Sequence, residues 1–428
     1  MTLRIGIAGL GTVGVGVMTV LRDNARLIEA RAGRPLVITA VSARDRARDR
    51  GVDTSGLRWH DDPVSLATDP GVDVVVELIG GAEGPARALA EATLRAGRPL
   101  VTANKALVAV HGAELGAIAA THDAPLAFEA AVAGGIPVIK ALREGLAANT
   151  IERVTGILNG TCNYILTAMT EQKRGFDEVL AEAQALGYAE SDPSTDVDGV
   201  DSAHKLAILA ALAFGRPVAF AEVHVEGIRR VSALDIALAG ELGYRIKLLG
   251  IARRTEAGVE ARVHPCMVPL ASPIARVDGV FNAVVAEGDF VGRVMLQGRG
   301  AGAGPTASAV VADLIDIARG RLTPIWGADA GSLSRLEAMP MAQHVGAYYL
   351  RLMVLDQPGV IADVTAVLRD HGVSLESLLQ HGRSPGEAVP VVLITHDVQE
   401  AHMRAALAQI GALSVVLEPP ALIRIEPG

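Results

Sequence analysis

The sequence is short of three features, each of which would point to a particular class of protein. Only two of its 428 residues are cysteine, which excludes a disulfide framework and fits a reducing cytoplasm. No apolar run approaches the roughly 18 residues that a membrane-spanning helix needs, and the first residues, MTLRIGIAGL, lack the length and cleavage site of a signal peptide. Acidic residues outnumber basic ones 48 to 39, a net charge of −9 that argues against a nucleic-acid surface. We therefore expect a soluble cytoplasmic protein with neither a membrane nor a nucleic-acid partner.

A glycine-rich turn follows the first predicted strand. Residues 3–8 form an apolar run typical of a strand, and residues 15–27 have the spacing of a helix. The motif G-x-G-x-x-G lies between them, as in dinucleotide-binding folds. Its first glycine makes the turn, the second lets the backbone approach a pyrophosphate, and the third packs helix against strand. The residues of this predicted cofactor loop are Gly9, Leu10, Gly11, Thr12, Val13 and Gly14.

Further strands and helices alternate after this turn. Strand patterns cover residues 36–41, 72–76, 99–102 and 124–128, and helical patterns cover 85–96 and 108–121. Such alternation favours a parallel sheet covered on both faces, so we predict a doubly wound, Rossmann-type α/β domain over residues 1–133. Ligands on such sheets bind beyond the carboxyl ends of the strands, where residues 77–81, 102–105 and 129–132 lie.

The residues after the second strand bear on the choice of dinucleotide. An acid at the end of this strand would bind the ribose 2′-hydroxyl of NAD(H), and none stands there. Arg44 follows shortly afterwards and favours the 2′-phosphate of NADP(H). The same arginine belongs to a loop in which arginines alternate with acids, as in an ordinary solvated loop. We therefore favour NADP(H) and leave NAD(H) open.

Residues 134–326 show a less regular order. Helical patterns cover 136–147, 161–171 and 176–186, and strand patterns cover 151–158, 246–252, 259–267 and 293–297. This mixture predicts an α+β domain for substrate binding and dimerisation. A second glycine-rich loop then opens a last helix, 306–319. Its Gly302 either faces the cofactor or serves as a hinge, and the helix over 305–320 either stays in this region or returns to the Rossmann domain.

The last part of the chain has the order βαββαβ. After a linker over 327–346, strand and helix patterns over 347–428 follow a ferredoxin-like order. A D-x-P-G turn, from Asp356 to Gly359, joins the first strand to the first helix. With this turn the unit resembles an ACT domain, a module that commonly senses amino acids. Gly359 would let a ligand carboxylate approach the helix N-terminus; a dimerisation module without a ligand is the alternative.

A cluster of acids leads into an apolar helix near residue 200. Asp201 and Lys205 are four residues apart and therefore share a helix face. An exposed pair with this spacing would contribute only a few tenths of a kcal/mol. The uncharged run from Leu206 to Leu212 instead predicts a partly desolvated lysine, which is suited to proton transfer. The alternative is an ordinary ion pair on a helix surface.

The residues around this pair resemble the signature of homoserine dehydrogenases. The pattern is A-x3-G-Y-x-E-x-D-P-x2-D-x2-G-x-D-x3-K, a large number of fixed positions over a short span. It is carried by Ala183, Gly187, Tyr188, Glu190, Asp192, Pro193, Asp196, Gly199, Asp201 and Lys205. The resemblance extends over the whole chain, from the cofactor domain to the ACT domain, and implies a monofunctional enzyme.

That resemblance implies a reaction and a role for several residues. L-Aspartate 4-semialdehyde and L-homoserine would be interconverted with NAD(P)(H), in the biosynthesis of threonine, methionine and isoleucine. Lys205 would give its proton to the carbonyl oxygen, Lys105 would lie between nicotinamide and substrate, and Asp201 would hold Lys205. The remaining residues that it assigns to the substrate are Glu190, Asp196, Gly160 and Thr161; Thr102 joins the cofactor contacts.

The resemblance also implies ligands beyond the substrate and the dinucleotide. A monovalent cation, sodium, would bind Glu129, Val132, Gly134 and Ile136, since carboxylate and carbonyl oxygens suit a hard cation. L-Threonine would bind the ACT domain near Asp356 and Gly359 and inhibit the enzyme. A homodimer or homotetramer is expected.

Two other functions are compatible with parts of this sequence. An amino-acid sensor, in which an ACT domain reports on an inactive cofactor domain, would not need Lys105, Asp201 and Lys205. A related dehydrogenase acting on another amino-acid semialdehyde would keep them. Cys162 is expected to be a packed, inert thiol, and we assign His204 no catalytic role.

Overall fold

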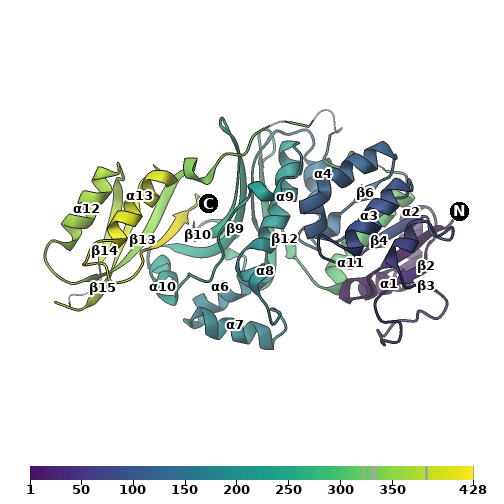
Figure 1. Ribbon diagram of the computed structural model, residues 1–428, viewed down its shortest axis with the longest axis horizontal. Helices are drawn as coiled ribbons and strands as arrows, with labels where there is room; N and C mark the ends of the chain where they lie inside the picture. The colour runs from purple at the N-terminus through teal and green to yellow at the C-terminus, as the bar shows by residue number, and fades with distance from the viewer. Residues whose placement is uncertain (322, 329–332, 335, 381–383, 428) are drawn as a thin grey trace.

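The computed structural model describes residues 1–321, 323–328, 333–334, 336–380 and 384–427. Three parts lie in a row: the N-terminal sheet, a mixed sheet with its helices, and the C-terminal unit (Figure 1). In the part of the chain that is described, no helix is both long and apolar enough to cross a membrane.

Six parallel strands form the N-terminal sheet, in the order β3-β2-β1-β4-β5-β6. The strands are β1 (Leu3–Ala8), β2 (Leu36–Ser42), β3 (Arg58–His60), β4 (Val74–Glu77), β5 (Leu100–Thr102) and β6 (Leu126–Ala127). The helices around it are α1 (Thr12–Asp23), α2 (Ala25–Ala32), α3 (Pro85–Arg95), α4 (Lys105–Thr121) and α11 (Ala303–Ala318).

Alternating side chains place helices on both faces of this sheet. Val74 and Val76 share a buried core with residues of α1 and α11, whereas Val75 packs into the core that holds residues of α3 and α4. Helix α11 packs on this sheet, although in the sequence it follows the strands of the middle domain. A Cβ on Gly16 of α1 would lie 2.7 Å from the carbonyl oxygen of Ala303, so glycine is what allows the two helices to meet so closely.

Two features of this domain differ from the sequence prediction. The short strand β3 was not expected, and the helix predicted over 15–27 is divided into α1 and α2 at Asn24. Asn24 has a φ of −105° and a ψ of 19°, outside helical geometry, and this residue separates the two helices. Helix α1 also begins earlier than predicted, at Thr12, directly on the glycine-rich loop.

The middle domain is a mixed sheet whose order begins β12-β11-β7-β9-β10. Its strands are β7 (Ile151–Ile157), β9 (Tyr244–Thr255), β10 (Gly258–Pro269), β11 (Phe281–Gly288) and β12 (Gly292–Arg299), with β8 (His224–Val225) beside β10. Its helices are α5 (Val138–Lys140), α6 (Gly160–Gln172), α7 (Phe176–Ala185), α8 (Ser194–Val197), α9 (Val200–Phe214) and α10 (Ala233–Glu241). Strand β11 was not predicted, and the helix expected over 136–147 starts only after Pro137 and continues as a π-helical turn.

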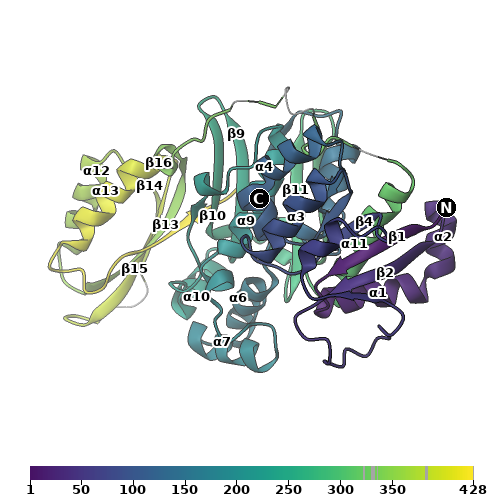
Figure 2. The same ribbon diagram turned by 45° about the vertical axis from the view of Figure 1, so that its right-hand side comes forward.

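The C-terminal unit has the predicted ferredoxin-like order. Its elements are β13 (Val345–Leu355), α12 (Val360–Asp370), β14 (Leu375–Gln380), β15 (Ala388–Thr395), β16 (Val398–Gln399), α13 (Glu400–Gly411) and β17 (Ala421–Ile425). Strand β17 pairs with β13 and also, in parallel, with β10 of the middle domain, so that Cys266 lies opposite Arg424. One eleven-stranded sheet therefore runs through both domains (Figures 1 and 2). Of the predicted linker, residues 329–332 and 335 lie outside the described residues.

Candidate functional site

The glycine-rich loop is tightly packed at two glycines and open at the third. Gly9 has a φ of +100°, and a Cβ there would lie 2.4 Å from the carbonyl oxygen of Leu78. A Cβ on Gly14 would lie 2.1 Å from the carbonyl oxygen of Gly9. At Gly11 a Cβ would meet no described atom within 4 Å, and Thr12 follows as the first residue of α1. The space beside Gly11, at a helix N-terminus, therefore fits a dinucleotide pyrophosphate.

The loop after β2 is fastened to this turn by an arginine. Arg50 donates from Nε to the carbonyl oxygen of Leu10, at 3.2 Å, and from Nη2 to that of Asp45. Its guanidinium carbon lies 5.8 Å from the centre of the Trp59 ring. Arg44 is exposed on the same loop, two residues after Ser42, whose carbonyl oxygen accepts from the Gly9 N–H at 2.8 Å. The geometry leaves the Arg44 side chain available to a phosphate group.

Hydrogen bonds at the ends of β4 and β5 orient the start of α4. The buried carboxylate of Glu77 accepts from the Thr102 hydroxyl at 2.6 Å and from the Ile79 N–H at 2.7 Å. Burial raises the pKa of Glu77 despite these bonds. Asn104 caps α4 by accepting from the Leu107 N–H at 3.1 Å. Lys105 is the first residue of the helix, at the carboxyl edge of the sheet.

Two lysines from different elements meet at one carboxylate. Lys205, on α9, donates to Oδ2 of Asp201 at 2.8 Å and to the carbonyl oxygen of Leu158 at 2.6 Å. Lys105 pairs with the other oxygen, Oδ1 of Asp201, at 2.7 Å. Asp201 and Lys205 are buried, whereas the Lys105 side chain is 42% exposed. One lysine is thus enclosed and the other lies at the surface of the site.

This arrangement lowers or raises the pKa of each of the three side chains, Lys205, Lys105 and Asp201. Burial lowers the pKa of Lys205; its contact with Asp201 offsets this only in part, and the charge on Lys105 adds to it. Burial also opposes the charge on Lys105, but the charge and hydrogen bond of Asp201 outweigh it, and the pKa is raised. The carboxyl of Asp201 is buried too, yet the two lysines hold its pKa well below the usual range. Of the three groups, Lys205 is therefore the one whose charged form its surroundings disfavour.

A second carboxylate lies next to this cluster. Asn159 donates from Nδ2 to Oδ1 of Asp196 at 2.7 Å and to Oδ2 of Asp201 at 2.8 Å. Burial and the charge on Asp201 raise the pKa of Asp196, although the bond from Asn159 opposes this. Glu190 is exposed, close enough to Lys105 for its charge to contribute to the raised lysine pKa. A substrate ammonium group would meet two carboxylates here.

The start of α6 lies against the same cluster. Asn159 is its N-cap, accepting from the Cys162 N–H at 2.8 Å, and Gly160 and Thr161 are its first residues. The Thr161 hydroxyl donates to the carbonyl oxygen of Tyr188, on the acidic segment. The N-terminus of this 13-residue helix is a suitable place for a substrate carboxylate.

The four residues of the predicted cation site lie near the link to α5, away from the lysines in sequence. Glu129 is buried, and its two carboxylate oxygens accept from the N–H groups of Ile139 and Lys140, both at 2.9 Å. Burial, with a contribution from Asp313, raises the pKa of Glu129 to about 7. The other three members are Val132, Gly134 and Ile136, the last of which accepts from the Val138 N–H at 2.7 Å.

The loop before α11 packs closely on these residues. Gly302 has a φ of +112° and is the N-cap of α11. A Cβ on Gly134 would lie 2.5 Å from the carbonyl oxygen of Gly300. Asn282 of β11 is buried beside Gly300, and neither polar atom of its side chain has a partner among the described residues. The loop thus connects the predicted cation residues with the end of β11.

The two predicted regulatory residues lie at one loop of the C-terminal unit. Asp356 accepts from the Ser384 N–H at 2.7 Å, and its own N–H donates to the carbonyl oxygen of Glu387. This fastens the first turn of the unit to the hairpin after β14. Gly359 has a φ of +96° and is the N-cap of α12, with space for a side chain beside it. These contacts fix the loop that joins β13 to α12.

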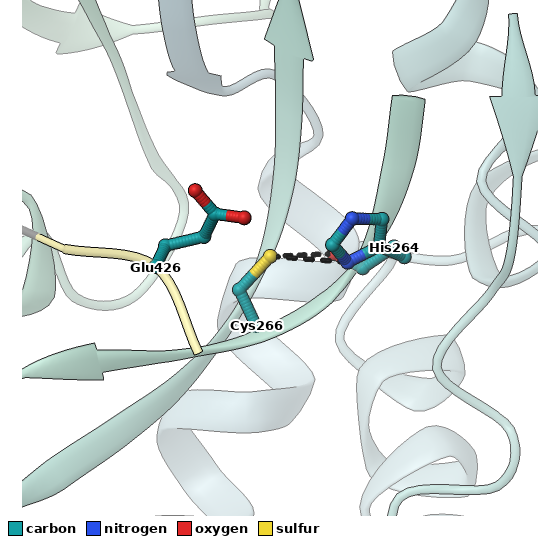
Figure 3. Close-up of side chains that lie close together, drawn as sticks. All are labelled: His264, Cys266 and Glu426. Atoms are coloured by element: carbon teal, nitrogen blue, oxygen red, sulfur yellow. Dashed lines mark hydrogen bonds between the residues drawn. The ribbon is translucent and has the colours of Figure 1, made fainter. Parts of the chain in front are cut away.

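A different cluster joins the middle domain to the C-terminal unit. His264 and Cys266 of β10 and Glu426, just after β17, point toward one another (Figure 3). Their residue types would suit a metal ion. Nη1 of Arg262, however, lies 2.6 Å from the carboxylate of Glu426 and 2.7 Å from Nε2 of His264. A guanidinium already bonds two of the three candidate ligands, so the cluster is an interdomain contact.

The structure brings the three predicted catalytic residues together with Asp196, one of the predicted substrate-binding residues. Lys105, Asp201, Lys205 and Asp196 form one connected cluster. Sequence reasoning did not assign the Asn159 side chain, which bonds both carboxylates. An N-cap signal was available, because an asparagine stands directly between a strand pattern and a helix pattern.

Models of three families match successive parts of this chain. The model for the NAD-binding domain of homoserine dehydrogenase matches residues 9–129, that for homoserine dehydrogenase matches 137–315, and that for the ACT domain matches 348–414. A curated homoserine dehydrogenase of Pseudomonas aeruginosa is 47% identical, over 99% of both chains. One from Bacillus subtilis is 39% identical, over 99% of this chain and 98% of its own.

Solved structures give the same result for the fold. A homoserine dehydrogenase from Thiobacillus denitrificans aligns with a TM-score of 0.94 at 46% identity, covering 100% of this chain and 99% of its own. A hyperthermophilic archaeal homoserine dehydrogenase in complex with NADPH aligns with a TM-score of 0.64 at 27% identity, covering 74% of this chain and 97% of its own. The predicted fold is confirmed over the full length.

Proposed function

This chain belongs to the homoserine dehydrogenase family of NAD(P)-dependent oxidoreductases, and from that premise we propose how its residues perform the reaction. The substrate pair is L-homoserine and L-aspartate 4-semialdehyde, and the pathway is the biosynthesis of threonine, methionine and isoleucine. The observation that carries the proposal is the contact of Lys105 and Lys205 with opposite oxygens of Asp201.

Lys205 transfers the proton. Its ammonium group is held by Asp201 and by the carbonyl oxygen of Leu158, which leaves one N–H for a substrate oxygen. Because burial lowers the pKa of Lys205, it gives its proton to the carbonyl oxygen in reduction and takes it from the hydroxyl in oxidation. The bound dinucleotide supplies or accepts the hydride.

Lys105 and the acids fix the substrate. The raised pKa of Lys105 keeps it charged, so it stabilises negative charge as it develops on the oxygen. Asp196 and Glu190 bind the substrate ammonium, and the start of α6, with Gly160 and Thr161, binds the carboxylate. The distance between the two ends of the substrate then determines which carbon faces the lysines.

NADP(H) is the proposed dinucleotide, with NAD(H) as the second choice. Gly11 leaves room for the pyrophosphate, and Arg44 is exposed on the loop after β2. The remaining residues proposed to contact it are Gly9, Leu10, Thr12, Val13, Gly14, Thr102, Lys105 and Gly302. Sodium is proposed at Glu129, Val132, Gly134 and Ile136, where a cation would stabilise the ionised form of a buried carboxyl whose pKa is raised to about 7.

The domain borders and the assembly are also proposed. We assign residues 1–133 to cofactor binding, 134–326 to catalysis and dimerisation, 327–346 to a linker and 347–428 to an ACT regulatory domain. Helix α11 packs on α1 and supports assigning 305–320 to the first domain. L-Threonine as effector at Asp356 and Gly359, a homodimer or homotetramer, and a cytoplasmic location complete the proposal.

One observation argues against the alternative that the protein is an amino-acid sensor. A protein that only reported amino-acid levels would have no need for a buried lysine with a lowered pKa beside a second lysine. The contacts of Asp201 with both lysines therefore favour catalysis.

The decisive assay follows reduction of NADP⁺, then NAD⁺, by L-homoserine in the wild type and in Lys205→Met. We expect turnover with NADP⁺ and a loss in kcat on the order of 10²–10⁴ in the variant. Lys247→Met is the matched control, since Lys247 is also fully buried with a lowered pKa, of about 8, outside the cluster. Replacing NaCl by choline chloride, adding L-threonine and measuring the mass by light scattering test the cation, the effector and the assembly. A folded wild type that is inactive with both cofactors would put the sensor first.

A further inference from the structure

Resting on the proposed function, we propose that Asn159 is a positioning residue that separates the roles of two neighbouring carboxylates. Its side-chain NH₂ group bonds Asp196 and Asp201 together, so that Asp201 serves the lysines and Asp196 serves the substrate ammonium. Asn159 lies outside the family signature, which covers residues 183–205.

The orientation of the Asn159 amide is fixed by the helix that it caps. Its Oδ1 accepts from the Cys162 N–H at 2.8 Å at the start of α6. Because one amide atom must accept there, the other, Nδ2, has to donate, and it faces Oδ1 of Asp196 and Oδ2 of Asp201. Aspartate and serine could cap the helix, but neither would offer two N–H donors to two carboxylates at once.

The bond to Asp201 is made at the oxygen that the catalytic lysine uses. Oδ2 of Asp201 accepts from Nδ2 of Asn159 and from Nζ of Lys205, both at 2.8 Å. Lys205 also donates to the carbonyl oxygen of Leu158, the residue directly before Asn159. Two consecutive residues therefore hold both groups. The backbone of Leu158 binds the proton donor, Lys205, and the side chain of Asn159 binds the counter-ion of that donor, Asp201.

The bond to Asp196 counteracts repulsion between the carboxylates. The groups facing Asp196 are Asp201 and Lys205 on α9, Lys105 on α4, and Asn159 and the Cys162 thiol at the start of α6. Burial and the charge on Asp201 raise the pKa of Asp196, whereas the Asn159 amide and the lysines lower it. Without the amide donor, Asp196 would take up a proton at higher pH and lose its attraction for an ammonium group.

The test separates this role from helix capping. Asn159→Asp keeps an oxygen for the Cys162 N–H but replaces the NH₂ donor by an acceptor turned toward two carboxylates. We expect the kcat/KM for homoserine to fall by about 10²-fold or more, because the site loses its geometry. The acid limb of its pH profile should move up by about one unit or more. The KM for NADP⁺ should change little.

Two further variants complete the experiment. Asn149→Asp is the matched control, since Asn149 likewise donates from Nδ2, to the carbonyl oxygen of Leu146, and accepts at Oδ1, from the Val291 N–H. It should keep the wild-type pH profile. Asn159→Ala loses both donor and cap, so it should show the same shift of the acid limb together with a lower thermal midpoint.

The outcomes distinguish this inference from the function on which it rests. An active wild type together with an Asn159→Asp protein of unchanged pH profile and near-normal kcat/KM would mean that Asn159 only caps α6. An Asn159→Asp protein whose KM for NADP⁺ rises as much as its KM for homoserine would also overturn the assigned role. A wild type that neither oxidises nor binds homoserine would remove the proposed function itself, and this inference with it.

Discussion

The protein contains two buried networks of charged side chains, and they are built in opposite ways. At the proposed catalytic site, Lys105 and Lys205 contact opposite oxygens of Asp201, so two cations meet one carboxylate. At the joint between β10 and β17, each arginine meets two acids: Arg262 bonds Glu260 and Glu426, and Arg424 bonds Glu226 and Glu400. In the first network two lysines contact the same carboxylate, whereas in the second each of these two buried arginines contacts two carboxylates.

The pKa shifts follow from this difference. Burial, with a smaller contribution from the charge on Lys105, lowers the pKa of Lys205, while contact with Asp201 raises the pKa of Lys105. At the joint, although burial opposes charge, hydrogen bonds from His224 and Arg424 lower the pKa of Glu226, and the pKa of Arg424 is raised. Lysine can release a proton when burial or a neighbouring positive charge lowers its pKa, whereas arginine stays charged. A buried charge alone therefore does not identify a catalytic site. The kind of cation, lysine rather than arginine, and the number of carboxylates that it contacts distinguish the two networks.

The largest effect should come from changing the charge balance of the first network. Asp201→Asn keeps the shape of the side chain but leaves two ammonium groups around a neutral amide. We expect kcat to fall by on the order of 10²-fold or more, because Lys205 is no longer held and its pKa falls further. Steady-state rates across the pH range measure this.

A more exposed carboxylate that also contacts two cations provides the control. Asp278 lies 3.1 Å from the buried Lys247 and 3.0 Å from Arg245. Asp278→Asn should leave the turnover number within a few-fold of the wild type. Equal losses in both variants would show that the effect is general destabilisation.

The second network should respond in stability while activity is kept. Arg424→Met leaves Glu226 and Glu400 without their buried partner, which costs about 3–5 kcal/mol when one partner of a buried pair is removed. We expect a much lower thermal midpoint and nearly normal turnover at low temperature. Since the pKa of Glu226 and of Glu400 is lowered in the fold, the stability that these acids contribute is present above the ordinary carboxyl pKa and lost as the pH falls.

Arg404 is a matched control for this prediction. It bonds the same two acids, but its side chain is 47% exposed. Arg404→Met should therefore cost less than about 1 kcal/mol, as is usual for exposed pairs. Similar midpoints for the two variants would mean that burial does not decide the strength of this joint.

Local sequence patterns predicted much of the fold and the central ion pair of the first network. The strand, glycine loop and helix at residues 3–23 were readable because turn chemistry and periodicity are local, and so was the βαββαβ order of the C-terminal unit. The ion pair of Asp201 and Lys205 was readable because four residues separate its members on one helix. Family, fold and enzyme class are confirmed by the relatives.

The second network was not predictable, because its partners are far apart in the sequence. Glu426 bonds Arg262, which is 164 residues away, and Arg153, which is 273 residues away. The pairing of β17 with β10 also depends on how two domains dock, and no turn or spacing records that. Strand β11, which lies between β12 and β7 in the sheet, was also not predicted.

The smallest effect concerns the two thiols, one beside each network. Cys162 is fully buried under the catalytic site, and Cys266 is fully buried at the joint. Burial and neighbouring acids raise the pKa of both thiols, so neither forms a thiolate readily. In the native wild type we expect almost no reaction with a thiol reagent at neutral pH, and reaction of both after denaturation.

Labelling can then report which network opens first. Arg424→Met weakens only the joint, so Cys266 should become reactive in the folded, active variant while Cys162 stays protected, because local opening follows local stability. Asp201→Asn should leave both thiols protected, since it alters charge at a site whose packing is unchanged. Mass spectrometry of the labelled peptides gives the measurement. Simultaneous labelling of both cysteines in Arg424→Met would show that the two domains open as one unit, and that the eleven-stranded sheet joins the networks into a single cooperative structure.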